Sequence, residues 1–214
     1  MNKLTLLTLA AVLAASSLAF AGVHLVGGTP TSGGNTIPFW GSQAAMRWQV
    51  FWFQREIGEA GPVTKVEFCN YEGSSSTGGT FNECKFLLCH TKLSAITAVF
   101  ASNYSGTPVT VYSGTFVISR PSPNEWFTLF ENPTTTLTYN NTDNLLIEVS
   151  WTSAPSSTNY NKRTYSGGSG RVYAYNATAS SGSVTANYAH YARLTIGYVG
   201  VAPTSLGRVK SIFK

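Results

Sequence analysis

The chain has 214 residues, with 14 Lys and Arg against 9 Asp and Glu and a net charge of +5. Only 11% of the residues are charged, against about 25% in a typical soluble domain, which excludes a coiled coil and an ordinary helical enzyme. Hydrophobic residues make up 43% and aromatic residues 13% of the chain, which is enough to bury a core and argues against disorder. The positive residues are scattered and form no basic run, so we expect no nucleic-acid partner.

Residues 1–21 have the three parts of a secretory signal peptide. Lys3 gives a positive start, residues 4–18 are mostly apolar, and Ala19-Phe20-Ala21 is a small-x-small cleavage site. The apolar stretch is shorter than the ~20 residues of a membrane span, and Thr and Ser interrupt it. We therefore expect cleavage near Ala21, a secreted, extracellular or cell-surface product, and no membrane span in the mature protein.

Short β-runs follow one another along the rest of the chain. Residues 22–38 contain several Gly and Pro residues and are predicted to be an extended segment with turns. Residues 46–54 alternate at first and then become continuously apolar, which is typical of a strand covered on both faces over part of its length. Residues 92–104 fit one short helix or a wrapped loop. Further strands are predicted at 63–69, 81–90, 109–112, 115–119, 125–130, 135–139, 145–151, 171–175 and 188–196.

These short runs, with turn-rich joints and almost no helix, predict an all-β fold, either an antiparallel sandwich or a barrel. We expect residues 22–199 to form a single antiparallel β-sandwich domain of jelly-roll-like type. A signal-peptide helix would precede this domain, and residues 200–214 would form a basic C-terminal tail.

Metal, cofactor and hydrolase motifs are missing from the sequence. Asp143 is the only aspartate, and His24, His90 and His190 lie far apart without any metal-ligand spacing. We expect neither a metal nor a cofactor, and we expect each histidine to lie on the surface or to be half-buried. The G-x-S-x-G motif of serine hydrolases is absent as well.

A glycosidase is the enzyme class closest to this composition, because compact jelly-roll xylanases share its size and its content of Tyr, Trp, Ser, Thr and Gly. Such enzymes place two carboxylates about 5–5.5 Å apart across a cleft when they retain stereochemistry. Glu125 and Glu148 are the leading candidates, with Glu67 and Glu131 as others. Glu148 alternates with Ile147 and Val149, so we expect it to face solvent. We predict no catalytic residues.

The tryptophans divide into two groups. Trp48, Trp52 and Trp151 alternate with other apolar residues in predicted strands, so they are expected in the core. Trp40 and Trp126 lie beside turn-forming or polar residues, and they are the candidates for an exposed, carbohydrate-binding ring.

Three cysteines are an odd number for an exported chain. A Cys69–Cys89 disulfide is the favoured pairing if their strands are neighbours, and it would leave Cys84 as a buried thiol. Three unpaired cysteines acting as small hydrophobic residues are an equally open alternative.

Three N-x-[ST] sequons occur, at Asn103, Asn140 and Asn176. All three lie in predicted loops. They matter only in a host that glycosylates its exported proteins.

Several longer motifs occur together between residues 80 and 151. They are Thr80-Phe-Asn82 with Leu88-Cys-His-Thr-Lys-Leu93, Pro108-Val-Thr-Val-Tyr-Ser-Gly114, Trp126-Phe127 and Tyr139-Asn-Asn-Thr-Asp-Asn-Leu-Leu-Ile-Glu-Val149. As a set they resemble a jelly-roll module of exported bacterial cell-surface proteins, which often carry C-terminal sorting or anchoring tails. The resemblance implies a fold and carries over no catalytic residue. It suggests a sorting role for residues 204–214, with a frayed terminus as the alternative.

Together these features predict a secreted, non-catalytic structural or adhesion module of the cell surface or extracellular matrix. Its expected partner is a second copy of itself, through edge strands or filament contacts, or a cell-surface polysaccharide. A carbohydrate-binding module that uses Trp40 or Trp126 is the first alternative. A jelly-roll glycosidase is the second.

Overall fold

The structure, a computed structural model, describes residues 21–28, 33–71, 78–120, 122–154, 161–164 and 168–197. The predicted signal peptide, except for its last residue, and the predicted basic tail lie outside the described residues. Within the described ranges, no helix is long and apolar enough to cross a membrane.

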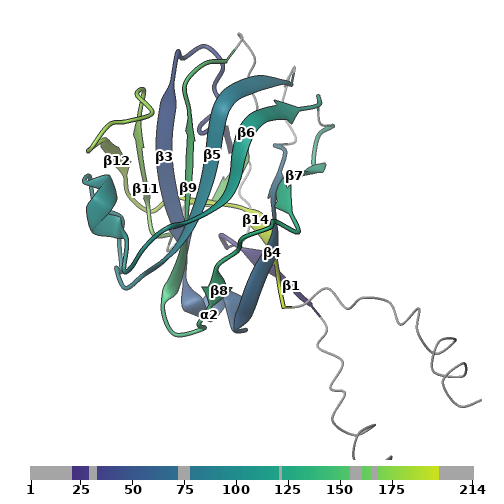
Figure 1. Cartoon of the computed structure of the whole chain (residues 1–214), viewed down its shortest axis with the longest axis vertical. Helices are drawn as coiled ribbons and strands as arrows, with labels where there is room; N and C mark the ends of the chain where they lie inside the picture. The colour runs from purple at the N-terminus through teal and green to yellow at the C-terminus, as the bar shows by residue number, and fades with distance from the viewer. Residues whose placement is uncertain are drawn as a thin grey trace, which may run out of the picture.

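The larger sheet has six strands, and all neighbouring strands are antiparallel (Figure 1). From one edge to the other, these are β12 (Ser183–Thr185), β11 (Arg171–Ala174), β3 (Met46–Trp52), β9 (Asn144–Trp151), β5 (Gly79–Thr91) and β6 (Val109–Ile118).

The smaller sheet packs against one face of the larger sheet and is also antiparallel. Its order is β1 (Gly22–Val26), β14 (Ala192–Ile196), β4 (Gly61–Cys69) and β7 (Trp126–Glu131), and β8 (Thr138–Tyr139) pairs with β4. A third, short sheet has the order β13 (Ala189–His190), β10 (Asn161–Thr164) and β2 (Gly34–Asn35). Apart from the short helix α2 (Gln54–Ile57) and one 3-10 turn, the described part of the chain is therefore antiparallel β-structure, as the sequence predicts.

Four strand pairs are nested within one another along the chain. The innermost pair, β5 with β6, lies in the larger sheet, and the next pair outward, β4 with β7, lies in the smaller sheet. The pair β3 with β9 returns to the larger sheet, and the outermost pair, β1 with β14, is in the smaller sheet. The chain is thus one long antiparallel hairpin whose successive strand pairs alternate between the two sheets.

The main core lies between the two sheets and is rich in aromatic residues. Trp48, Val50 and Trp52 alternate along β3 toward the smaller sheet, where Phe68 and Leu194 belong to the same buried cluster. The indole Nε1 of Trp52 donates a hydrogen bond of 2.9 Å to the carbonyl of His190, so this buried ring leaves no polar atom unsatisfied. Trp48, Trp52 and Trp151 are all fully buried, which confirms that they are core residues.

A second apolar cluster, the outer cluster, covers the opposite face of the larger sheet. Its buried members are Phe51, Cys89, Ile96, Phe100, Leu146 and Val172. Residues 92–104 form a loop across this face, and the loop contains a single 3-10 turn, η1 (Phe100–Asn103). Because β3 is covered on both faces, both sets of its alternate side chains are buried. This confirms the prediction of a strand that is covered on both faces over part of its length.

Three element boundaries differ from the sequence prediction. The two strands predicted at 109–112 and 115–119 are one strand, β6, which passes through Gly114 at a φ of +151° that is unfavourable for other residues. The strand predicted at 188–196 is divided into β13 and β14. Residues 22–38, predicted to be extended with turns, contain β1 and β2. Local sequence does not reveal these two strands, because their pairing partners lie more than a hundred residues away.

Candidate functional site

Aromatic side chains form a row beside β11, which we call the aromatic row and which consists of Trp40, Tyr173 and Tyr175. The rings of Tyr173 and Tyr175 are 5.7 Å apart, and those of Tyr175 and Trp40 are 5.8 Å apart. Tyr175 is 48% exposed, whereas Trp40 and Tyr173 are half-buried. An exposed ring supported edge-on by other rings is a rigid apolar surface with polar groups at its margin.

The position of β11 in the fold explains why this row is open. Residues alternate along a strand, so Arg171, Tyr173 and Tyr175 share one face, while Val172 on the other face belongs to the outer cluster. The strands β11 and β12 extend the larger sheet beyond β3 and lie outside the four nested pairs. Tyr173 packs against the main core, and Tyr175, just after the end of β11, is the exposed member of this face.

Arg171 lies at the other end of the same face and is only 5% exposed. Its Nη1 donates to Oδ1 of Asn35 at 2.6 Å, and its Nε donates to Oγ1 of Thr185 at 3.4 Å. The guanidinium carbon is 4.2 Å from the ring centre of Tyr188 and 5.0 Å from that of Tyr173. Residues from β2, β12 and the segment before β13 thus hold the cation beside the aromatic row.

The expectation that Glu148 faces solvent is wrong. Its side chain points away from the main core, as the alternation predicts, but the loop 92–104 covers it and leaves the residue 3% exposed. Its Oε2 accepts a hydrogen bond of 2.6 Å from Nε2 of Gln49 and lies 3.0 Å from Nη2 of Arg47. The hydroxyl of Tyr104 also donates to Oε2, and burial together with the Glu148 carboxylate raises the pKa of Tyr104.

Asn103 continues this network into the covering loop. Its Nδ2 donates to Oε1 of Gln49 at 2.8 Å, and its Oδ1 accepts a bond of 2.9 Å from the backbone N–H of Thr97. The residue is fully buried. The Asn103 sequon is therefore covered in the folded protein, whereas the sequon residues Asn140 and Asn176 are exposed.

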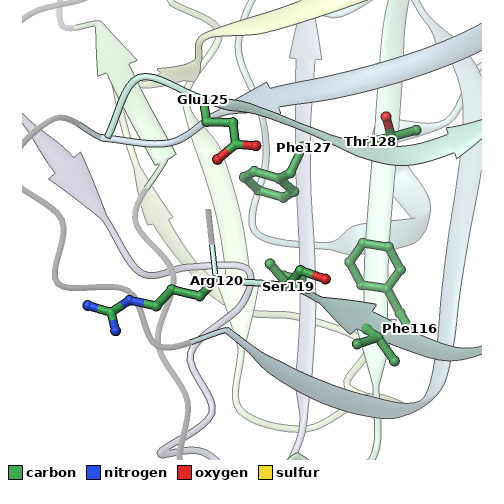
Figure 2. Close-up of a pocket in the computed structure, with 8 residues that line it drawn as sticks. Phe116, Ser119, Arg120, Glu125, Phe127 and Thr128 are labelled. Atoms are coloured by element: carbon green, nitrogen blue, oxygen red, sulfur yellow. The ribbon is translucent and has the colours of Figure 1, made fainter. Parts of the chain in front are cut away.

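Glu125 lies in a different place, at a pocket of about 210 Å³ between the edge strands β6 and β7. Figure 2 shows Glu125 beside Phe127, with the side chain of Arg120 pointing away from the carboxylate. The Glu125 carboxylate accepts a hydrogen bond of 2.6 Å from the backbone N–H of Ser122. Since Glu148 is covered on the outer face of the larger sheet, the structure does not bring Glu125 and Glu148 into one cleft.

Glu67 and Glu131, the other two candidate acids, lie on the outer face of the smaller sheet. Nε of Arg193 is 2.6 Å from Oε2 of Glu67, and Nζ of Lys65 is within 4 Å of both glutamates. Burial alone would raise the pKa of Glu67, but hydrogen bonds and charges from Arg193 and Lys65 outweigh it and lower the pKa. Glu67 is therefore an ionised partner in an ion-pair network and is not suited to be a proton donor.

Trp126 lies at the start of β7, next to Arg193 on the outer face of the smaller sheet. Its ring is 4.7 Å from the guanidinium carbon of Arg193 and 5.3 Å from the ring of Tyr191, and it is half-buried. No ring contact in the described part of the chain joins Trp126 to Trp40. The two tryptophans singled out from the sequence thus belong to separate surfaces.

The three histidines have separate environments. Nε2 of His24 lies 2.8 Å from Oε2 of Glu59, and His90 stacks on Tyr139, with burial lowering the pKa of His90. His190 is fully buried and hydrogen-bonds through Nε2 to the carbonyl of Ile37, so for His190 the expectation of a surface or half-buried site is wrong. Among the described residues, no group of His, Cys, Asp and Glu could hold a metal ion.

The predicted Cys69–Cys89 disulfide is not formed. Cys69 lies in β4 of the smaller sheet, whereas Cys89 lies in β5 of the larger sheet and belongs to the outer cluster. The prediction fails because these two strands are consecutive in the chain but lie in different sheets. Cys84 is a buried thiol in the main core, and burial raises its pKa, so it is poorly suited to be a nucleophile.

The sequence reasoning missed Arg171, Tyr173 and Tyr175 as functional candidates. A signal was available, because residues 171–175 alternate so that these three side chains share one face of the predicted strand. What the sequence could not supply was the approach of Trp40 and Asn35, which come from more than a hundred residues away.

Searches of protein-family profiles, curated proteins and solved structures find no match to this chain. The candidate site therefore rests on the geometry described above.

Proposed function

We propose that this chain is a secreted, non-catalytic adhesion module of the cell surface or extracellular matrix, with a jelly-roll fold, that binds polysaccharide. The aromatic row is its binding surface. The observation that carries the proposal is the contact of three rings in series, with Tyr175 48% exposed at the surface. Sugars dock the apolar C–H faces of their rings on aromatic side chains, and the phenol and indole groups supply hydrogen bonds at the margin.

The nested strand pairs support the jelly-roll part of the proposal. The eight strands β1, β3, β4, β5, β6, β7, β9 and β14 wind a single long hairpin into two facing sheets. Double-sheet jelly rolls of eight strands are built in this way, and lectin domains are among them. The strands β11 and β12 are additions to this arrangement; β11 carries Tyr173 of the aromatic row, and Tyr175 follows directly after this strand.

The dispersal of the carboxylates supports a function without catalysis. Glu148 and Glu67 are held by cations, and Glu125 lies alone at the edge pocket. The secreted location rests on the sequence pattern of residues 1–21.

The test is retention of the protein in affinity gels that contain xylan, β-glucan, galactan or polygalacturonate. We expect at least one polymer to retard the wild type, and Tyr175→Ala to weaken that binding by about tenfold or more, because interface aromatic residues dominate binding energy. Trp126→Ala is the matched control, since Trp126 is a half-buried tryptophan on the other sheet. Failure of every polymer to retard the wild type, or loss of binding in Trp126→Ala alone, would contradict the proposal.

Self-association is a second candidate, favoured by apolar side chains on two edge strands. Val117 on β6 is 61% exposed, and Val23 and Leu25 on β1 are 61% and 56% exposed. Edge strands with exposed apolar residues are sites where another chain can add. Light scattering after size-exclusion chromatography would give an assembled mass that rises with concentration, whereas a monomer at every concentration would contradict this candidate.

A further inference from the structure

Among the strand residues whose side chains the structure describes, three arginines contact aromatic rings, and they differ in one respect. Arg47 lies over the ring of Phe100 and pairs with Glu148, and Arg193 lies over Trp126 and pairs with Glu67. Arg171 lies over two tyrosine rings, but none of the carboxylates in the described ranges contacts it. Arg171 therefore differs from the other two arginines because it has no carboxylate partner among the described residues, although only 5% of it is exposed.

The charge on Arg171 is only partly compensated by its neighbours. Asn35 and Thr185 are neutral hydrogen-bond partners, and the two tyrosine rings contribute cation–π attraction. A guanidinium has five N–H donors, and the hydrogen bonds to described residues use two of them. Hydrogen bonds to an ionised acceptor are roughly twice as strong as neutral ones, so a carboxylate that reached the remaining donors would stabilise this buried cation further.

The position of Arg171 connects this charge to the aromatic row. Its guanidinium lies over Tyr173, the ring of Tyr173 contacts Tyr175, and Tyr175 contacts Trp40. Tyr175 follows directly after β11 and lies four residues from Arg171, which is ~13 Å of extended chain at about 3.3 Å per residue. A ligand of several sugar rings on the aromatic row would be long enough to span this distance.

We propose that Arg171 binds the anionic group of an acidic polysaccharide whose sugar rings stack on the aromatic row, and that this group is the carboxylate of a uronic acid. This proposal rests on the proposed function and specifies its ligand. Arg171 supplies charge and orientation at one end of the surface, and the aromatic rings supply the apolar contact. The planar guanidinium fork matches a planar carboxylate, which a lysine ammonium cannot reproduce.

The first test requires no mutation and compares polygalacturonate with the same polymer after its carboxyl groups have been reduced to alcohols. A charge-assisted hydrogen bond contributes enough free energy for about a tenfold change in affinity or more, so the wild type should bind the acidic form more tightly by that factor. Equal binding of both forms would overturn the role of Arg171 and leave the proposed function standing. Binding of neither form, nor of any other polymer in the panel, would overturn the proposed function itself.

The second test compares Arg171→Lys with Arg55→Lys. Arg55 is an exposed arginine that also lies over an aromatic ring, at 4.1 Å from Phe53, so it controls for loss of a stacked guanidinium elsewhere. We expect Arg171→Lys to weaken binding of polygalacturonate by about tenfold, with binding of the reduced polymer unchanged in both variants. Thermal unfolding of each variant checks that the fold is retained. Unchanged affinity in a folded Arg171→Lys, or tighter binding of a sulfated polymer than of polygalacturonate, would overturn the proposal.

Discussion

Glu148 is the most buried charged residue on the outer face of the larger sheet, and it connects several polar side chains under the covering loop. The carboxylate accepts hydrogen bonds from Gln49 and Tyr104 and forms an ion pair with Arg47, and Gln49 in turn binds Asn103 of the covering loop. These contacts satisfy polar groups that the loop would otherwise bury without partners.

Glu148→Ala should therefore lower the free energy of unfolding by about 3 kcal/mol, because it leaves the Arg47 guanidinium, the Gln49 amide and the Tyr104 hydroxyl without the carboxylate that they contact. Urea denaturation gives this quantity. Glu131→Ala is the control, since Glu131 is exposed and its surface ion pair with Lys65 contributes roughly 0–1 kcal/mol. Equal loss of stability in the two variants would show that the buried network contributes nothing specific.

The pH dependence of stability should carry the signature of Glu67, whose pKa is lowered by Arg193 and Lys65 in the folded protein. A carboxyl group with a lowered folded pKa stabilises the fold above its unfolded pKa of about 4.3, and the contribution is lost as pH falls through the folded pKa. In Glu67→Gln, the free energy of unfolding should depend less steeply on pH below about 4.3 than in the wild type. Parallel pH profiles for the two proteins would contradict this assignment.

At the scale of elements, the covering loop 92–104 makes the central strands β3 and β9 of the larger sheet buried on both faces. Phe100 is the loop's fully buried aromatic side chain, and it packs in the outer cluster with Phe51 and Leu146. The neighbouring Val99 is 46% exposed.

Phe100→Ala should therefore lower the free energy of unfolding by about 3–5 kcal/mol, as the removal of a buried aromatic side chain does. Val99→Ala, one residue away and exposed, should change it by less than about 0.5 kcal/mol. Similar losses in both variants would mean that the loop is not packed as described.

Strand existence could be predicted from the sequence wherever hydrophobic alternation is strong. The run 145–151 gives β9 and the run 63–69 gives β4, because each buries one set of alternate residues in the main core. The strand β1 exposes Val23 and Leu25, β2 is only two residues long, and both gain their hydrogen bonds from distant partners, so local pattern could not reveal them.

The site was predictable only in part, for a related reason. Alternation indicates which face of a strand a residue occupies, so Glu148 was placed on the correct face, but it cannot indicate whether a loop covers that face. The pairing of Cys69 with Cys89 failed similarly, because sheet membership depends on which distant strands pair. Trp40 was predicted as a candidate ring, but its contact with Tyr175 depends on the position of β11 in the sheet order.

The whole molecule is a hairpin wound into two sheets, with an exposed aromatic ring, Tyr175, next to the strands added beyond β3. The aromatic row lies there, with the buried Arg171 beneath it, whereas Trp126 lies on the outer face of the smaller sheet with Arg193. A ligand that binds as proposed must therefore change the environment of one tryptophan and leave the other unaffected.

The most direct measurement follows the five indole N–H signals in a two-dimensional ¹H–¹⁵N NMR spectrum during titration with oligogalacturonate. The expected result is that the Trp40 signal shifts in proportion to ligand bound, while the signals of Trp126 and the three core tryptophans stay in place. A shift confined to Trp126, or five unchanged signals with a polysaccharide demonstrably bound, would contradict it.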